Sequence, residues 1–379
     1  MIDRSSIRFA YAHDWLVQMR GGELVLDRII RRFGPGPIYT LVANGQPLSE
    51  SIDACPLRTS FLQQFPGAAG RLRRWMLPLM PKAVDRLRVR PDCDILISTS
   101  SCVMKGIRPP EGVPHLCYCH SPARYIWSQG TVYDGGLRGI GLRAMTPAFK
   151  RWDRRTAANV TRFIAASTYI AGRIRACFGR ESTVISPPVR TAFFTPDPTV
   201  EREEFWLLAA ALEPFKRVDL AIEAANRRRH PLKIAGAGSI ERELRDRAGP
   251  TVEFVGLQSA ERLRDLYRRA GLFLFPSLED FGIAPVEAMA CGCPVVALRG
   301  GGALDTVNES CGAFMDEQSP DALLAAVERA PRACDDQCRQ NAERFGEDRF
   351  DRALEESVAE VMNAGGDRPS LGGTPRETL

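Results

Sequence analysis

The sequence predicts an α/β protein built from two consecutive doubly wound domains, and three observations lead to this prediction. The chain has 379 residues, of which 44% are hydrophobic, enough to form more than one buried core. Short apolar runs alternate with amphipathic stretches along the chain, as parallel strands connected by helices do. A proline-rich polar stretch interrupts this alternation near the middle, so we expect a domain boundary there.

The first series of alternating segments fills the N-terminal half. Strands are predicted at residues 7–12, 37–42, 94–98, 115–119, 162–166 and 183–185. Each run is short, apolar and bounded by turn-forming or polar residues. Amphipathic stretches such as residues 23–32 and 168–177 lie between the runs and predict helices. We therefore expect a parallel sheet that helices cover on both faces.

The second series begins after four prolines break the pattern: Pro187, Pro188, Pro196 and Pro198. Strands are then predicted at residues 205–210, 232–235, 252–255, 272–275 and 294–297. Helices are predicted at residues 219–229, 240–248, 260–270 and 285–290. Sheets of this kind bind ligands beyond the carboxyl ends of their strands. We therefore expect two doubly wound domains that face a central cleft.

These boundaries define the expected organisation of the chain. The predicted parts are an N-terminal domain (1–186), a linker (187–204), a C-terminal domain (205–345), a C-terminal helix (346–363) and a disordered tail (364–379). The helix is expected to return to the N-terminal domain. The tail consists of Gly, Pro and polar residues, a composition that is typical of disorder.

Charge is distributed unevenly along the chain. The net charge is +5, yet residues 1–186 contain 27 Lys and Arg against 13 Asp and Glu, whereas residues 187–379 contain 24 against 33. Two surfaces with different partners are therefore expected, and no motif points to nucleic acid. The 11 cysteines lack the spacing of zinc ligands. The chain shows neither a secretory leader nor an apolar run of 18 residues, which predicts a cytoplasmic protein.

The segment PSLEDFGIAPVEAMACGCPVVA at residues 276–297 contains the most chemical information. Its pattern predicts a strand end, a loop, a helix and the next strand. Glu279 lies in the loop and Glu287 in the helix, so both carboxylates can face one ligand. Free backbone N–H groups at the helix entrance, residues 281–283, can bind an anionic or hydroxyl-rich ligand. Taken singly, either glutamate could also be a solvated, structural residue.

This segment resembles the E-x7-E signature of the retaining glycosyltransferases of family 4, which have the GT-B fold of two Rossmann-like domains. The stretch GIAPVEAMACGCPVVA is similar to the family pattern nearly position for position. The resemblance implies that Glu279 is a catalytic residue that holds donor-sugar hydroxyls, and that Glu287 contacts the nucleotide ribose. It also implies that the backbone of Phe281, Gly282 and Ile283 contacts the sugar and the diphosphate.

The resemblance extends to other loops of the second domain. The segment LEPFKRVDLAIEA is similar to the diphosphate-contact segment of the family, which implies donor contacts for Lys216 and Arg217. A cation there would stabilise the departing nucleoside diphosphate. The family usually has an arginine five residues before the lysine, and this chain has Ala211 there. The segments KIAGAG and VGL resemble nucleotide-side loops, which implies donor contacts for Gly236 and Val255.

The N-terminal half contains further similar segments. Gly21 and Gly22 follow the first strand and open a helix, like the GGxE turn of the family, and are expected near the donor diphosphate. The segment YCHSPARYIW resembles the H-x-P-x-R-Y-x-W segment of bacterial mannosyltransferase-like members. This resemblance implies that His120 is a catalytic residue facing the donor sugar. The residues expected on the acceptor side are Asp14, Arg124 and Trp127.

These features predict a retaining, metal-independent hexosyltransferase that needs no cofactor besides its nucleotide-sugar donor. GDP-mannose is the favoured donor, with UDP- and dTDP-hexoses as alternatives. The departing diphosphate is expected to help deprotonate the acceptor, because no covalent nucleophile is evident. The expected acceptor is a glycan or a polyprenyl-diphosphate-linked saccharide of cell-surface polysaccharide synthesis. Basic stretches at residues 71–90 and 150–155 either dock on the inner face of the cytoplasmic membrane or are solvated helix faces.

Two alternative functions remain open. A sugar-nucleotide 2-epimerase can have the same two-domain fold, although it would need acid–base groups in a different loop pattern. A non-catalytic member of the family would bind a nucleotide sugar without transferring it, and Ala211 keeps this alternative open. Product formation with a panel of donors and acceptors distinguishes these functions.

Overall fold

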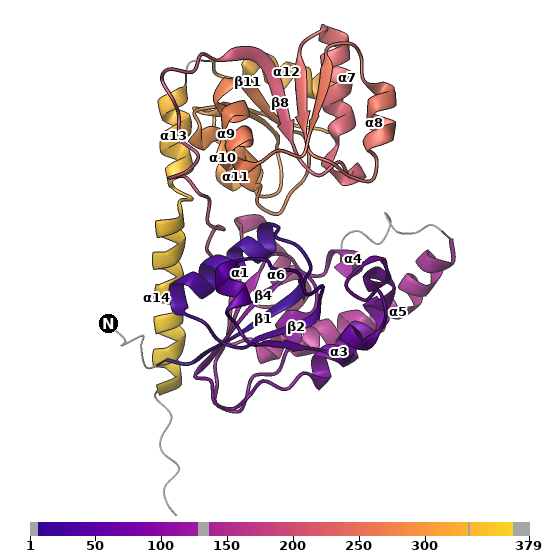
Figure 1. Cartoon of the computed structure of the whole chain (residues 1–379), viewed down its shortest axis with the longest axis vertical. Helices are drawn as coiled ribbons and strands as arrows, with labels where there is room; N and C mark the ends of the chain where they lie inside the picture. Colours follow the sequence, from indigo (N-terminus) through magenta and orange to yellow (C-terminus); the bar gives the residue numbers. More distant parts are fainter. Residues whose placement is uncertain (1–6, 128–135, 333, 367–379) are drawn as a thin grey trace, which may run out of the picture. The chain divides into compact units, whose positions relative to one another are not determined.

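The computed structural model describes residues 7–127, 136–332 and 334–366, which divide into two compact units (Figure 1). Unit 1 comprises Met1–Ile164, Cys177–Ser182 and Arg352–Leu379, and unit 2 comprises Ala165–Ala176 and Thr183–Asp351. Each unit contains one sheet with helices packed against it. The predicted α/β class with two Rossmann-like domains is therefore confirmed.

The sheet of unit 1 has the strand order β3-β2-β1-β4-β5-β6-β7 within the described residues. Its strands are β1 Phe9–Leu16, β2 Ile38–Ala43, β3 Leu57–Thr59, β4 Ile95–Ser100, β5 His115–Cys119, β6 Arg162–Ala165 and β7 Ser182–Val184. The pairings of β1, β2, β3, β4 and β5 are parallel. All the strands predicted for this half are present. The sequence did not predict β3, because this short edge strand is exposed and has no apolar run.

Helices pack against both sides of this sheet. They are α1 Gly21–Phe33, α2 Glu50–Asp53, η2 Phe61–Gln64, η3 Arg71–Leu79, α3 Met80–Arg86, η4 Met104–Gly106, α4 Arg124–Trp127, α5 Gly136–Thr156 and η6 Ala157–Asn159. Apolar side chains of η3, α3 and α5 form one buried cluster with those of β1, β2 and β4. The alternation along β1 points Tyr11 away from that cluster, and its hydroxyl donates to the carbonyl of Gly34, just beyond α1, at 2.7 Å.

The sheet of unit 2 has the strand order β10-β9-β8-β11-β12-β13 within the described residues, and all the pairings are parallel. Its strands are β8 Glu203–Ala209, β9 Leu232–Ala235, β10 Val252–Gly256, β11 Ala270–Phe275, β12 Val295–Leu298 and β13 Gly312–Met315. Five of these strands were predicted. The sequence did not predict β13, whose four residues begin with a glycine.

The two faces of this sheet bury different sets of side chains. Phe205 and Leu207 of β8 pack on the side of α10 and α13, whereas Trp206 and Leu208 pack on the side of α7 and α12. The helices and turns of unit 2 are η7 Pro214–Lys216, α7 Val218–Arg228, α8 Glu241–Arg247, α9 Ala260–Arg269, α10 Ile283–Ala290, α11 Ala303–Thr306, α12 Pro320–Arg329 and α13 Asp335–Glu343. A strand buried on both faces explains why β8 appears in the sequence as a continuous apolar run.

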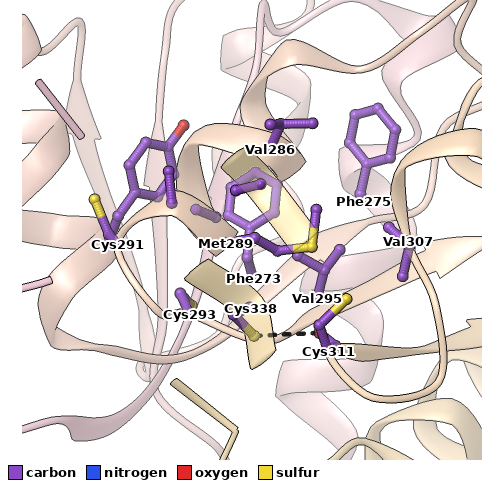
Figure 2. Close-up of a cluster of buried hydrophobic side chains, with 14 of the residues drawn as sticks. Phe273, Phe275, Val286, Met289, Cys291, Cys293, Val295, Val307, Cys311 and Cys338 are labelled. Atoms are coloured by element: carbon purple, nitrogen blue, oxygen red, sulfur yellow. Dashed lines mark hydrogen bonds between the residues drawn. The ribbon is translucent and has the colours of Figure 1, made fainter. Parts of the chain in front are cut away.

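Figure 2 shows the core on the side of α10, where thiols pack among apolar side chains. Phe273 and Met289 lie in the same buried cluster as Cys293 and Cys338. All 11 cysteines of the chain are free and buried. In this core the thiols pack as small apolar groups. This packing explains why the chain contains buried cysteines although their spacing is not that of metal ligands.

The proline-rich stretch between the two series packs into unit 2. Val189 and Phe194 are buried in the cluster around β8 and α10, and Val189 also pairs with Gly346. Most of helix α6 (Thr168–Phe178), up to Ala176, belongs to unit 2 as well. Just before this helix, the hydroxyl of Ser167 donates to the carbonyl of Asp280. The chain passes between the two compact units at residues 164/165, 176/177, 182/183 and 351/352. The domain boundary near residue 186 remains a prediction.

Helix α14 spans Glu347–Gly366, three residues beyond the end predicted for the C-terminal helix. Its second part belongs to unit 1, where Arg32 and Arg162 form ion pairs with Glu355 and Glu360. The remainder of the expected tail, residues 367–379, lies outside the described residues. Over the described parts of the chain, no helix is long and apolar enough to cross a membrane.

Candidate functional site

The candidate site of unit 2 lies where the strand order of its sheet changes direction. The chain passes from β8 through α7 to β9 on one side, whereas β11 pairs with the other side of β8. The loops after β8 and β11 therefore begin side by side at the carboxyl edge of the sheet, where such sheets bind ligands. Lys216 ends the turn after β8, Glu279 follows β11, and their side chains form an ion pair. The fold thus joins two predicted site residues from distant segments.

The loop around Glu279 is held by its neighbours. Ser277 Oγ donates to Glu279 Oε1 at 3.1 Å, and the backbone N–H of Gly302 donates to the Glu279 carbonyl at 2.9 Å. A side chain at Gly301 would place its Cβ 2.2 Å from that carbonyl oxygen. The glycine turn between β12 and α11 therefore lets two backbones approach closely and fixes the position of Glu279.

Helix α10 begins directly after this loop. Its N-cap, Gly282, has a φ of 93°, and a Cβ there would lie 2.9 Å from the ring of Phe275, so the position requires glycine. The side chain of Phe281 is buried in the core, and Ile283, the first helical residue, packs partly against the same cluster. These residues therefore offer a ligand mainly the free backbone N–H groups of the first helical turn.

Glu287 has an environment different from that of Glu279. It lies within α10, and its Oε2 accepts a hydrogen bond from the hydroxyl of Tyr267 at 3.3 Å. Burial raises the pKa of Glu287 to about 7, although the charge of Arg190 and the hydrogen bond from Tyr267 act in the opposite direction. A carboxyl group with this pKa can accept or donate a hydrogen bond to a ligand hydroxyl near neutral pH.

The second predicted cation of this loop is already engaged. Arg217 has a left-handed backbone with a φ of 52° and makes a bidentate interaction with Asp219, with both N–O distances at 3.1 Å. A third nitrogen donates to Gln318 at 3.3 Å. Ala211, at the position where the family usually has arginine, is exposed. Lys216 is therefore the cation of this loop that pairs with a predicted site residue.

The two predicted nucleotide-side residues lie in neighbouring loops. A Cβ at Gly236 would lie 1.8 Å from the carbonyl oxygen of Ala210, so only glycine allows the loops after β8 and β9 to touch. The N–H of Gly236 donates to the carbonyl of Gly256 at 2.8 Å. The carbonyl of Val255 accepts a hydrogen bond from the amide of Gln258. The structure thus joins the β8, β9 and β10 loops through their backbones.

The site residues of unit 1 lie at the corresponding change of strand order, between β1 and β4. His13 Nδ1 is hydrogen-bonded to Thr99 Oγ1 of β4 at 2.6 Å, and His13 Nε2 lies 3.6 Å from Glu23 Oε1. Glu23 also accepts from the N–H of Arg20, the N-cap of α1, at 3.2 Å. Burial acts to raise the pKa of Glu23, but its interactions with His13, together with a backbone hydrogen bond, leave the pKa below its usual value.

Gly22 brings the predicted catalytic histidine into this group. A Cβ at Gly22 would lie 3.4 Å from the ring of His13 and 3.6 Å from Nε2 of His120. Gly21 is the first residue of the same helix, as the motif predicted. His120 Nε2 is buried without a hydrogen-bond partner among the described residues. Burial and the neighbouring His13 lower the pKa of His120 to about 3, so a neutral ring can meet a ligand hydroxyl.

Asp14 is surrounded by backbone donors. Its Oδ2 accepts from the N–H groups of Ser101 at 2.6 Å and Cys102 at 2.9 Å. Its Oδ1 accepts from the N–H groups of Val103 at 2.8 Å and Met104 at 2.9 Å. The side chain is almost fully buried, so we interpret Asp14 as the anchor of the turn after β4. The acceptor contact that the sequence suggested for Asp14 remains a prediction.

The other two predicted acceptor-side residues lie on α4. Arg124 begins this helix, and its charge contributes to the low pKa of His120. The indole N–H of Trp127 donates to Oδ2 of Asp153 at 2.7 Å, and Oδ1 of Asp153 pairs with the ammonium group of Lys105 at 2.8 Å. Lys105 and Asp153 are both buried, so Trp127 is fixed by an internal ion pair.

Several residues next to the predicted site were missed by the sequence motifs. They are His13, Glu23, Ser277, Tyr267, Lys105 and Asp153. His13 and Glu23 flank predicted residues in the sequence, so the expectation of a site at the end of the first strand could have included them. Tyr267 and Asp153 come from distant helices, and no spacing in the sequence connects them to Glu287 or Trp127.

No cluster of three or more His, Cys, Asp or Glu suited to a metal occurs in the described parts of the chain.

Comparison with protein families gives two matches that together extend from residue 39 to residue 347. Residues 39–193 match the model of "Glycosyltransferase Family 4", and residues 190–347 match that of "Glycosyl transferases group 1". The second match contains Lys216, Glu279 and Glu287, and the first contains His120.

Individual curated relatives match only part of the chain, at identities of 33% or less for the two described here. The chain is 33% identical over 232 residues to a GDP-mannose-dependent alpha-(1-6)-phosphatidylinositol monomannoside mannosyltransferase of Mycolicibacterium smegmatis, covering 53% of this chain and 56% of the relative. It is 29% identical over 215 residues to a D-inositol 3-phosphate glycosyltransferase of Mycobacteroides abscessus, covering 50% of this chain and 47% of the relative. The chain thus spans about half the length of the curated relatives that it matches.

A solved structure agrees with the observed fold over most of the chain. The crystal structure of Anabaena Alr3699/HepE in complex with UDP has a TM-score of 0.66 and 16% sequence identity, and the match covers 93% of this chain and 100% of the other. At this identity the likeness shows the fold alone. Together with the two family matches, it shows that the chain belongs to the family-4-like glycosyltransferases of GT-B fold.

Proposed function

We propose that this chain is a retaining, metal-independent hexosyltransferase that uses a nucleotide sugar as donor. The contact between Lys216 and Glu279 carries this proposal, because it places a cation suited to a diphosphate beside a carboxylate suited to sugar hydroxyls. The free N–H groups at the start of α10 add donors for a phosphate or a hydroxyl. In unit 1, Nε2 of His120, for which the described residues provide no hydrogen-bond partner, offers a further contact for a hydroxyl group.

The proposed chemistry relies on positioning and on stabilisation of charge. Cleavage of the bond between the sugar and the phosphate develops negative charge on the leaving diphosphate, which Lys216 and the first turn of α10 stabilise. A leaving phosphate oxygen takes the proton of the acceptor hydroxyl while the acceptor oxygen bonds to the anomeric carbon on the same face. The anomeric configuration is then retained. Glu279 holds the sugar hydroxyls during this step, and Glu287 holds the ribose.

GDP-mannose is the donor that we propose to test first. The segment around His120 resembles that of mannosyltransferase-like proteins, and one relative is named as a GDP-mannose-dependent mannosyltransferase. UDP-hexoses form the second group of candidates, because UDP is the nucleotide in the structurally similar Anabaena protein.

The experiment is a thermal-shift screen of nucleotide sugars followed by product analysis. We expect stabilisation by GDP-mannose and, with a glycan or polyprenyl-diphosphate acceptor, formation of GDP and an α-mannoside. An NMR measurement of the anomeric coupling then reports retention or inversion. Transfer should persist in a chelator. An inverted product would refute the retaining mechanism, an epimerised nucleotide sugar would favour the epimerase, and binding without transfer to any acceptor would favour a non-catalytic protein.

We further propose that unit 1 docks on an anionic membrane surface, where a lipid-linked acceptor would be found. Four large apolar side chains between residues 65 and 79 are 41–58% exposed, with Trp75 the most exposed of them. No acidic residue occurs between Asp53 and Asp85, whereas this interval contains five Lys and Arg. Exposed aromatic and aliphatic side chains among cations are typical of surfaces that bind anionic lipid.

Vesicle co-sedimentation tests this docking. Vesicles with anionic lipid should pellet the wild-type chain at low salt, whereas neutral vesicles should not. Trp75→Ser should reduce the pelleted fraction. Leu304→Ser is the matched control, because Leu304 is 54% exposed but belongs to unit 2. Equal pelleting of both variants, or no pelleting of the wild type, would contradict the proposal.

A further inference from the structure

The ion pair between Lys216 and Glu279 joins two groups that the proposed function assigns to different parts of one ligand. Lys216 is assigned to the diphosphate, and Glu279 to the sugar hydroxyls. In the protein itself these side chains neutralise each other, and they are only 19% and 12% exposed. A poorly hydrated ion pair resists separation, because a buried charge without its partner is stabilised neither by that partner nor by a full shell of water.

We propose that Glu279 acts as an internal counter-ion of Lys216 and thereby makes the site discriminate the intact nucleotide sugar from the free nucleoside diphosphate. This inference rests on the proposed function and adds a selectivity to the same site. A diphosphate binds Lys216 only by replacing Glu279 as its partner. What then happens to the displaced carboxylate depends on whether the ligand carries a sugar.

The intact donor satisfies both groups at once. Its phosphate oxygens pair with Lys216, and its sugar hydroxyls donate to the carboxylate of Glu279. The free nucleoside diphosphate pairs with Lys216 but leaves Glu279 with the hydroxyl of Ser277, next to a phosphate of like charge. Because the buried carboxylate of Glu279 then lacks its cationic partner, the binding of the free nucleoside diphosphate becomes less favourable. The product of the reaction therefore binds more weakly than it would without this carboxylate.

The surrounding backbone prevents Glu279 from avoiding this conflict. Its carbonyl accepts from the N–H of Gly302, and Gly301 lies so close to that carbonyl that no side chain would fit between them. The neighbouring cation does not replace Lys216, because Arg217 shares its charge with Asp219 through two hydrogen bonds. The ligand diphosphate and the Glu279 carboxylate thus compete for the same cation, Lys216.

The inference predicts that removal of the carboxylate charge strengthens the binding of the diphosphate product. Glu279→Gln keeps the size of the side chain and removes the charge that competes for Lys216. We expect the dissociation constant of the nucleoside diphosphate to fall about three- to tenfold, or by about 0.7–1.4 kcal/mol, once the competing charge is removed. The affinity for the intact sugar nucleotide should fall, because the glutamine loses charge-assisted hydrogen bonds to hydroxyls.

Isothermal titration calorimetry with GDP and UDP, and with GDP-mannose and UDP-glucose, tests this prediction. Glu213→Gln is the matched control, since Glu213 lies on the same loop and pairs with Ser239 instead of Lys216. In a Lys216→Gln background, Glu279→Gln should no longer tighten diphosphate binding. Thermal melting of each variant verifies that it is folded.

The outcomes separate this inference from the proposed function. A wild-type chain that binds none of the four nucleotides would overturn the proposed function, and the inference with it. A wild-type chain that binds them, with a Glu279→Gln variant whose affinity for GDP or UDP is unchanged or weaker, would overturn the inference alone. Equal tightening by Glu213→Gln would also overturn it, because a general change in local charge would then explain the effect.

Discussion

Replacement of Asp14 by asparagine tests whether this residue anchors the fold of unit 1 or contacts the acceptor. In the structure its two carboxylate oxygens accept four backbone hydrogen bonds from the turn after β4. Asparagine has almost the same shape, but only one of its two terminal groups is an acceptor. The Asp14→Asn variant therefore keeps two of the four bonds and points an amide N–H toward the other two donors.

The expected cost follows from this count. A hydrogen bond to a charged group contributes about 1.5–3 kcal/mol, and a buried donor without a partner costs about 1–3 kcal/mol. Loss of two bonds should thus lower the free energy of unfolding by about 3–5 kcal/mol. A domain of this size loses roughly 2–4 °C in Tm for each kcal/mol, so the transition of unit 1 should fall by about 10 °C. Such a loss is a substantial fraction of a typical domain stability of about 5–15 kcal/mol.

Urea unfolding followed by tryptophan fluorescence measures this change in unit 1, because four of the five tryptophans belong to it. These tryptophans are Trp15, Trp75, Trp127 and Trp152. Asp92→Asn is the matched control, since Asp92 is half exposed and pairs with Arg90 on the surface, where the expected change is below about 0.5 kcal/mol. A variant within about 1 kcal/mol of the wild type that had nevertheless lost transfer would refute the anchor role and restore the acceptor contact.

Three other substitutions test single elements of the structure. Because the pKa of Glu287 is raised to about 7 from 4.5, the folded chain holds a proton that the unfolded chain releases, and stability should decrease as pH rises through this interval. Glu287→Gln should flatten that dependence and add up to about 3 kcal/mol at pH 8, measured by urea unfolding at pH 5 and 8. Gly236→Ala should destabilise unit 2 by several kcal/mol in thermal melts, since its Cβ would overlap the carbonyl of Ala210. Lys105→Met should cost about 3–5 kcal/mol by leaving the buried Asp153 carboxylate without its counter-ion. The double variant with Asp153→Leu should recover only part of this loss, because the indole N–H of Trp127 then lacks its acceptor.

Hydropathy predicted the strands well but did not predict how far β1 extends. The apolar run ends at residue 12, whereas the strand continues to Leu16 and includes His13 and Asp14. These polar side chains are buried because Thr99 and the turn after β4 supply hydrogen bonds. A pattern of apolar residues cannot reveal such burial, since the compensating partners come from a segment more than 80 residues away.

The meeting of Lys216 and Glu279 is the part of the site that topology alone could predict. Both residues follow strands that become neighbours where the sheet order reverses, so a parallel sheet brings their loops together. The pairing of Arg217 with Asp219 was not predictable in the same way. It depends on a left-handed backbone at Arg217, which turns the guanidinium toward a residue two positions later. Local backbone conformation, rather than residue type, thus explains why we assign the ligand diphosphate to Lys216 and not to Arg217.

The charge of each half of the chain therefore says little about the affinity of its site for an anion. The predicted donor site lies in the acidic half, residues 187–379, and its lysine already has a carboxylate partner. A diphosphate must compete with that partner, so its affinity depends on the free energy of exchanging one anion for another. Before a ligand binds, the pair has no net charge, so the site attracts a diphosphate from a distance less strongly than a lone lysine would. Salt weakens the internal pair and the ligand contact alike, so binding of the intact donor should depend on ionic strength less steeply than an open basic surface would.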